Sequence, residues 1–158
     1  MTVRTGIGWD SHRLAGGRPL IVGGVTIPHE QGLDGHSDAD VLTHAVIDAL
    51  LGAAGLGDIG RHFPDTDERW KDADSLELLE HVAGLVRDAG MRICNVDMTL
   101  VLERPKIGPY REQITGRLAA ALDLDESLVN VKATTGEGIG FVGRGEGAAA
   151  LAVATLES

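Results

Sequence analysis

Hydrophobic positions along the chain predict an alternation of short strands and longer helices. Apolar runs and apolar alternation predict strands at residues 3–12, 20–22, 25–27, 93–102, 128–134 and 147–156. Apolar residues at helical spacing predict helices at residues 39–54, from 74–75 to a stop at Gly90, and at 109–122. The final segment is rich in alanine and could equally be helical by propensity. This order predicts an α+β fold, a helix-on-sheet sandwich with a mixed sheet and an extra hairpin.

Turn and capping residues mark the ends of these elements. Gly23-Gly24 between two apolar runs indicates a hairpin. Ser37 or Asp38 is the expected N-cap of the first helix, and Gly55 or Gly57 is expected to end it. The polar loop that follows, at residues 61–67, is long enough to suggest a functional role.

Composition narrows the class of protein. The chain has 158 residues, of which 43% are hydrophobic, so we expect one domain that spans residues 1–158. A net charge of -10 argues against nucleic-acid binding, because the phosphate backbone would be repelled. The sequence shows neither an apolar run of transmembrane length nor a leader, which predicts a soluble, cytoplasmic protein without a membrane partner. Cys94 is expected to be a buried strand residue.

Two segments together suggest a metal site. On a strand that reaches residue 12, Asp10 and His12 point to the same side. The first helix offers further candidates, at four-residue spacing that places them on one face: His36, Asp40, His44 and Asp48. Two imidazoles and one carboxylate with an open position are the ligand set of a catalytic zinc site. Spacing alone supports surface or capping roles for the two histidines about equally well. The neighbouring aspartates favour a metal, although they could also fix the ring tautomers.

Three other segments carry polar groups that a core does not require. Carboxylates on the glycine-rich loop at residues 57–65 suit the hydroxyls of a ribose or polyol, although each is more often a solvated turn residue. Lys106 is close to a predicted helix N-terminus, a place where backbone N–H groups bind phosphate. Residues 132–138 combine hydroxyls with Glu137, which could hold a hard cation that bridges phosphates. With the histidines, these segments indicate a phosphorylated substrate and a Lewis-acid metal.

At these motifs the chain resembles the 2-C-methyl-D-erythritol 2,4-cyclodiphosphate synthase family of non-mevalonate isoprenoid biosynthesis, in a monofunctional form. The matching motifs lie in order at residues 8–12, 36–41, 49–54, 56–60, 63–67, 95–97, 104–106, 130–135 and 143–147. The resemblance implies that the 2-phosphate of 4-diphosphocytidyl-2-C-methyl-D-erythritol 2-phosphate attacks the β-phosphorus and releases CMP, a lyase reaction. It also implies zinc at Asp10, His12 and His44, and magnesium or manganese at Glu137.

The same resemblance assigns the substrate contacts. His36 with Ser37, and Thr134 with Thr135, would brace the phosphates, with His36 and Thr135 in catalytic roles. The methylerythritol portion would be held by Asp58, Gly60 and Asp65, and Ile59 and Phe63 are further expected substrate contacts. The cytidine diphosphate would lie against residues at two strand ends: Leu102, Lys106, Ile107, Ala133 and Thr134.

The resemblance further implies a homotrimer whose active sites lie between subunits, around a central apolar channel. Arg144 and Glu146 would close that channel near one end, where the arginine would hold an isoprenoid diphosphate, and Phe141 and Arg144 are also expected substrate contacts. Alternatively, Arg144 and Glu146 simply pair with each other between subunits. Two other functions remain open at this point: a phosphate- or nucleotide-binding module with structural zinc, and a metal-dependent phosphohydrolase.

Overall fold

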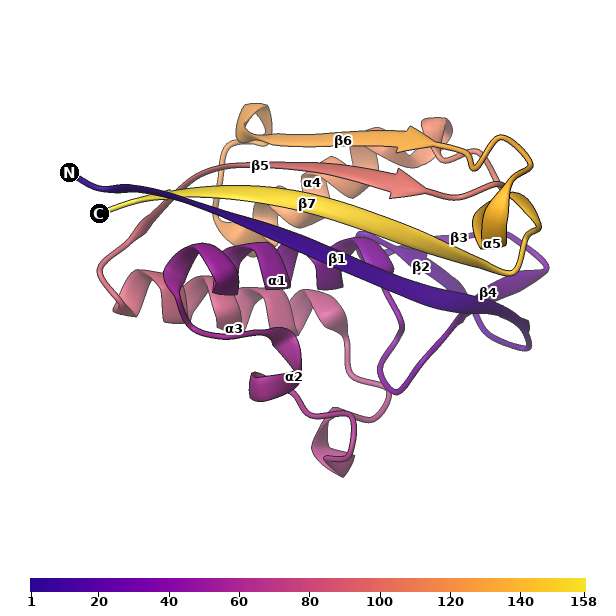
Figure 1. The fold of residues 1–158 in the computed structure, drawn as a ribbon, viewed down its shortest axis with the longest axis horizontal. Helices are drawn as coiled ribbons and strands as arrows, with labels where there is room; N and C mark the ends of the chain where they lie inside the picture. Colours follow the sequence, from indigo (N-terminus) through magenta and orange to yellow (C-terminus); the bar gives the residue numbers. More distant parts are fainter.

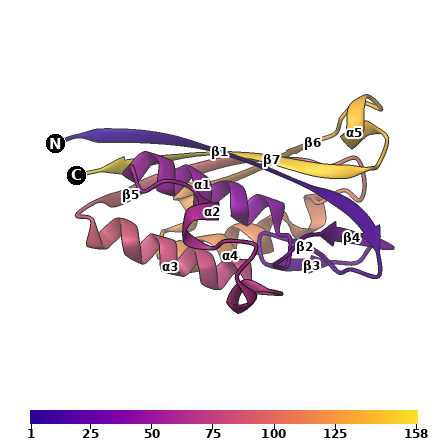
Figure 2. The same cartoon turned by 60° about the horizontal axis from the view of Figure 1, so that its bottom comes forward.

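Helices cover one face of a five-stranded mixed sheet in the computed structural model, which describes all residues from 1 to 158 (Figures 1 and 2). The strand order is β4-β1-β7-β5-β6. The strands are β1 (Val3–Gly16), β4 (Gln31–Asp34), β5 (Arg92–Val101), β6 (Val129–Thr134) and β7 (Gly147–Glu157). The β5 and β6 strands run parallel, and the other neighbours run antiparallel. A separate hairpin joins β2 (Leu20–Val22) to β3 (Val25–Ile27). The predicted fold class is therefore confirmed.

Three long helices form the covering layer, and they bury one continuous apolar core of 41 residues. They are α1 (Val41–Ala54), α3 (Ser75–Asp88) and α4 (Arg111–Leu122). Two shorter helices lie in connections, α2 (Ile59–His62) and α5 (Gly140–Gly143), as do 3-10 turns at 68–70, 108–110 and 126–128. None of these helices has the length and apolar character that a membrane crossing requires.

Two glycines of β1 let α1 lie directly on the strand. A Cβ atom at Gly6 would be 2.1 Å from the carbonyl oxygen of Ala49, and one at Gly8 would be 1.8 Å from that of Ala45. Only glycine, which has no Cβ atom, permits this backbone contact. The first turns of α1 are thereby held next to β1 (Figure 1). Asp10 and His12 belong to this strand.

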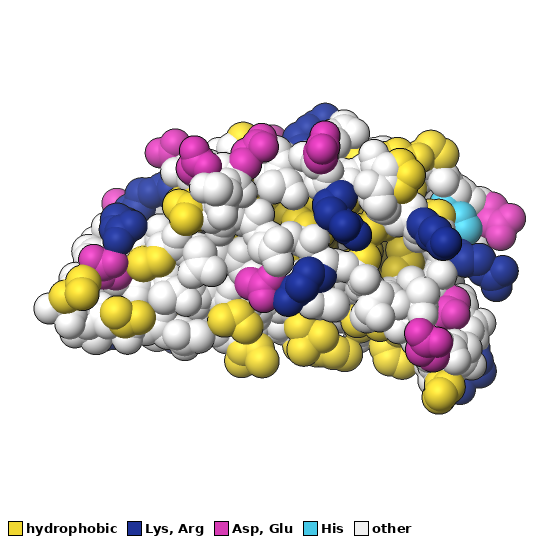
Figure 3. All heavy atoms as spheres, turned by 90° about the horizontal axis from the view of Figure 1, so that it is seen from above, with side chains coloured by type: hydrophobic (Ala, Val, Ile, Leu, Met, Phe, Trp, Pro, Cys, Tyr) yellow, Lys and Arg dark blue, Asp and Glu magenta, His cyan; other side chains and the backbone are white.

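The other face of the sheet is uncovered. Side chains alternate along β1, so that Gly6 and Gly8 face the helices while Ile7 and Trp9 are 70% and 52% exposed. Leu151 of the neighbouring β7 is also exposed, as are Val3 and Val153. Figure 3 shows hydrophobic side chains gathered along the lower side of the view. This uncovered sheet face is an apolar surface without a partner in the chain.

The structure corrects several expectations. The N-cap of α1 is Asp40 rather than Ser37 or Asp38, because its carboxylate accepts the backbone N–H of Thr43. Gly55 ends α1 in a left-handed conformation. The final segment is a strand, as first predicted. Cys94 lies in β5 but is half-exposed rather than buried.

Candidate functional site

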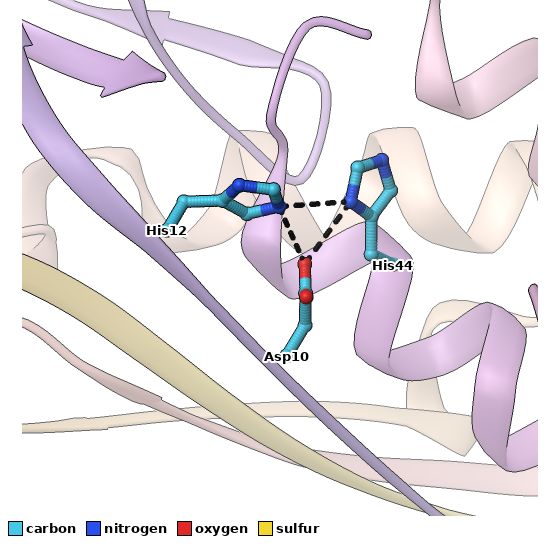
Figure 4. Close-up of side chains that lie close together, drawn as sticks. All are labelled: Asp10, His12 and His44. Atoms are coloured by element: carbon cyan, nitrogen blue, oxygen red, sulfur yellow. Dashed lines mark hydrogen bonds and ion pairs between the residues drawn. The ribbon is translucent and has the colours of Figure 1, made fainter. Parts of the chain in front are cut away.

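Asp10, His12 and His44 converge on one point between β1 and α1 (Figure 4). Oδ2 of Asp10 lies 2.8 Å from Nε2 of His12 and 3.0 Å from Nδ1 of His44. The two ring nitrogens are 3.4 Å apart. Nitrogen ligands of a tetrahedral zinc ion are roughly 3.3 Å from one another, so the three atoms are spaced for a shared divalent cation with small adjustments. The predicted triad is thus brought together.

The electrostatics of the triad favour an ionised carboxylate. Burial opposes ionisation of Asp10, but hydrogen bonds from His12 and His44 outweigh it and lower the pKa of the carboxyl to about 2. Burial also disfavours the charged imidazole of His12, yet its hydrogen bond to Asp10 raises the pKa of the ring overall. Asp10 therefore carries a negative charge at neutral pH and can bind a cation.

Each histidine has a hydrogen-bond partner on the ring nitrogen that faces away from the triad. Nδ1 of His12 lies 3.0 Å from the carbonyl oxygen of Asp34 in β4. Nε2 of His44 lies 2.7 Å from the hydroxyl of Ser75, the first residue of α3. When these nitrogens donate, the lone pairs of His12 Nε2 and His44 Nδ1 are left for a metal.

The other three residues expected on one face of the first helix do not join the triad. His36 precedes α1, and its Nε2 lies 3.0 Å from the carbonyl oxygen of Asp67. Asp40 is fully buried and accepts the backbone N–H groups of Gly23 and Gly24, which fastens the β2-β3 hairpin to the start of α1. Burial raises the pKa of Asp48, and its carboxylate accepts the N–H of Ile59 at 2.7 Å. Of the four, only His44 belongs to the triad.

The triad opens into a cavity of about 460 Å³, here called the triad cavity. Its lining includes most of the residues expected near the triad and the methylerythritol: Asp10, His12, His36, Ser37, His44, Ile59, Gly60, Phe63 and Asp65. Asp58 is absent from this lining, because its carboxylate caps α2 by accepting the N–H of Arg61 at 2.9 Å.

Trp70 is a lining residue that sequence reasoning missed. Its ring packs edge-on against Phe63, with centroids 5.0 Å apart, and the Arg69 guanidinium lies over it. The signal for it was a large aromatic residue just beyond a polar loop. Gly35, Pro64 and Leu78 complete the cavity and were also not predicted.

A second cavity, of about 290 Å³, lies where β5 and β6 end and is here called the strand-end cavity. Its lining contains the five residues expected to hold cytidine diphosphate: Leu102, Lys106, Ile107, Ala133 and Thr134. Thr135, which is expected with Thr134 to brace the phosphates, also lines it. Arg111 adds a second positive charge. Figure 3 looks onto this side of the molecule, where basic side chains surround a hollow with hydrophobic atoms at its base. Such a lining suits an anionic ligand with an apolar or flat portion.

Besides Asp58, three predicted site residues line neither of these cavities. Glu137 is exposed, with a left-handed backbone (φ 53°) that its N–H stabilises by donating to the Thr135 hydroxyl. Phe141 lines a smaller cavity of about 220 Å³ beside His12. Arg144 forms a two-point ion pair with Glu146 of the same chain, at 3.0 and 3.2 Å. The alternative in which these two residues pair between subunits stays a prediction.

The geometry defines an α+β protein with a metal-ligand triad and two cavities, and comparison with known proteins identifies the family. The family model described as YgbB matches residues 3–157. A relative from Geobacillus kaustophilus, named 2-C-methyl-D-erythritol 2,4-cyclodiphosphate synthase, is 61% identical over 98% of both chains. The chain belongs to this YgbB family of 2-C-methyl-D-erythritol 2,4-cyclodiphosphate synthases.

Solved structures agree with this assignment. A 2C-methyl-D-erythritol-2,4-cyclodiphosphate synthase described as the CDP-bound form is 40% identical, has a TM-score of 0.90, and is matched over 98% of this chain and 100% of its own. A bifunctional IspDF from Campylobacter jejuni is 46% identical with a TM-score of 0.95. The match covers 98% of this chain and 42% of the bifunctional one.

Proposed function

We propose that the chain is a cyclodiphosphate synthase that converts 4-diphosphocytidyl-2-C-methyl-D-erythritol 2-phosphate into 2-C-methyl-D-erythritol 2,4-cyclodiphosphate and CMP, a lyase of non-mevalonate isoprenoid biosynthesis in the cytoplasm. Full-length relatives with this name support the reaction. The single structural observation that carries it is the Asp10-His12-His44 triad at the wall of a cavity lined by the expected substrate residues.

The metal at the triad is zinc. Two imidazole nitrogens and one carboxylate oxygen, with the fourth direction open to a cavity, form the donor set of a catalytic zinc site. Glu137 is the ligand of a second ion, magnesium or manganese, since a lone exposed carboxylate suits a hard cation that keeps its water and phosphate ligands. When bound, the two metals supply Lewis-acid polarisation and charge neutralisation at the phosphates.

The protein groups orient two anionic parts of one substrate. His36 and Ser37 lie in the triad cavity and brace the phosphates from that side. Thr134, the last residue of β6, and Thr135, which follows it, lie in the strand-end cavity and brace the phosphates from the other side. No side-chain nucleophile is needed, because the attacking oxygen belongs to the substrate and holding it near the β-phosphorus supplies much of the rate increase.

The remaining cavity residues recognise the two ends of the substrate. In the triad cavity, Ile59, Gly60, Phe63 and Asp65 hold the methylerythritol portion, with Asp58 nearby at the cap of α2. In the strand-end cavity, Lys106 binds the diphosphate, while Leu102, Ile107 and Ala133 contact the cytidine. The relative described as the CDP-bound form supports a cytidine nucleotide as a ligand.

The active protein is a homotrimer in which the triad cavity of one subunit faces the strand-end cavity of its neighbour. Two observations support this arrangement. The expected substrate residues divide between two separate cavities of one chain. On the uncovered sheet face, Ile7, Trp9 and Leu151 are also exposed to solvent, and association of subunits through this face would bury them. Sedimentation would detect the trimer directly, and a monomer at assay concentration would contradict the shared site.

The reaction is tested by incubating the purified protein with the cytidyl substrate and identifying the products. Cyclisation yields CMP and the cyclic diphosphate, and a chelator should abolish both. Linear phosphate products would instead indicate a phosphohydrolase, and no turnover would indicate a binding module whose metal is structural.

A further inference from the structure

A buried hydrogen-bond chain continues from His44 away from the triad. Its Nε2 lies 2.7 Å from the hydroxyl of Ser75, which is fully buried. That hydroxyl is in close hydrogen-bond contact with Oδ1 of Asp38. Nε2 of His44 and Oδ1 of Asp38 are 4.0 Å apart, with the serine oxygen between them. These hydrogen bonds therefore link an imidazole of the triad to a second carboxylate, that of Asp38.

The direction of these hydrogen bonds is fixed by the carboxylate. Oδ2 of Asp38 accepts the backbone N–H of Ser75 at 2.9 Å, and Oδ1 accepts that of Asp40 at 3.1 Å. An ionised carboxylate can only accept, so the Ser75 hydroxyl donates its single proton to Asp38. Its free lone pair then accepts the Nε2–H of His44. With a metal in the triad, Nε2 of His44 would keep its proton and the Nδ1 lone pair would be left for the ion.

We infer that Asp38 and Ser75 are positioning residues of the metal site: they hold the His44 ring and tautomer and place a negative charge behind this ligand. The inference rests on the metal triad of the proposed function. His12 differs, because its outer nitrogen faces a neutral backbone carbonyl of Asp34. Outer partners of metal-bound histidines raise ligand basicity, and their loss typically weakens metal binding about 10- to 100-fold.

Ser75→Ala isolates this role. It removes the hydroxyl but keeps the backbone N–H that Asp38 accepts, and Asp74, which caps α3, is untouched. We expect the zinc Kd, measured by competition with a chromophoric chelator, to rise about 10- to 100-fold. Ser37, whose hydroxyl lies 3.2 Å from Nε2, retains part of the interaction. The double variant Ser37→Ala/Ser75→Ala should therefore bind zinc more weakly than Ser75→Ala alone.

Thr43→Val is the matched control. The Thr43 hydroxyl is equally buried and donates to a carboxylate, Oδ2 of Asp40, at 2.8 Å, but it does not touch the triad. This variant should lose stability and keep the zinc affinity of the wild type. A loss of affinity equal to that of Ser75→Ala would overturn the inference, because general loosening of α1 would then explain both.

A spectroscopic readout separates positioning from packing. In the zinc-loaded wild type, the Nε2–H proton of His44 should exchange slowly and resonate downfield in ¹⁵N-resolved NMR, and Ser75→Ala should remove this signal. Unchanged zinc affinity in Ser75→Ala would contradict the positioning role and leave the metal site itself standing. Absence of zinc binding by the wild type would contradict the proposed metal site, and the positioning role with it.

Discussion

Gly8 of β1 lies so close to Ala45 of α1 that a Cβ atom on the glycine would be 1.8 Å from the alanine carbonyl oxygen. This contact sets the distance between the strand that carries Asp10 and His12 and the helix that carries His44. Ala45 directly follows His44 in the chain, so the same contact also places this ligand. The metal triad therefore depends on the absence of a side chain at Gly8.

Gly8→Ala should push α1 away from β1. We expect a loss of about 2–3 kcal/mol or more in the free energy of unfolding, because backbone atoms cannot move aside as a side chain can. Urea denaturation measures this loss. Gly16→Ala is the control in the same strand, since nothing lies within 4 Å of its added Cβ. Similar stability of the two variants would contradict the close approach of α1.

His44→Ala should remove zinc and activity while the protein stays folded. A metal that serves catalysis contributes less to folding than a structural one, and the core of 41 residues remains. Metal analysis and circular dichroism test both halves of this expectation. His62→Ala is the comparison, because this half-buried histidine bonds to the Leu56 carbonyl and does not line the triad cavity. Full zinc content in His44→Ala would disprove the ligand assignment.

Glu137→Gln should keep zinc and lose the part of the rate that depends on magnesium. The amide retains the shape of the side chain but lacks the charge that attracts a hard cation. Initial rates measured across a magnesium titration give the result, with Glu126→Gln as an exposed carboxylate control. A Glu137→Gln enzyme with the rate and magnesium response of the wild type would refute the role.

We expect Arg144 to contribute to the binding of isoprenoid diphosphates. It is paired with Glu146 within the chain, yet its side chain is 59% exposed and could contact an anion in a trimer channel. Geranyl or farnesyl diphosphate should raise the Tm of the wild type, because a ligand that binds only the native trimer stabilises it. Arg144→Ala should lose this shift. No shift at saturating ligand, or an equal shift in the variant, would leave only the ion pair.

The sequence predicted those parts of the fold and site that follow from local periodicity. Asp10 and His12 share a face because side chains alternate along β1. The alternation of exposed Leu151 and Val153 with buried alanines likewise made β7 a strand, against the helical propensity of alanine. The two cavities gathered residues whose motifs the family resemblance had already singled out.

The features that were missed depend on tertiary contacts. Asp40 became the cap of α1 because the amides of Gly23 and Gly24 meet it there, and no local signal distinguishes it from Ser37 or Asp38. The β4 strand has no apolar alternation and forms by pairing with the end of β1. Ser75 resembled a simple helix cap, since it lies 31 residues from the histidine that it contacts.

The cyclisation itself is tested most directly by running the reaction in H₂¹⁸O and weighing both products by mass spectrometry. If the substrate's own 2-phosphate attacks the β-phosphorus, CMP and the cyclic diphosphate form together and neither carries ¹⁸O from the solvent. If instead no cyclic diphosphate forms, and CMP or a linear phosphate product carries one ¹⁸O atom as it forms, water is the nucleophile. That result would contradict the assignment.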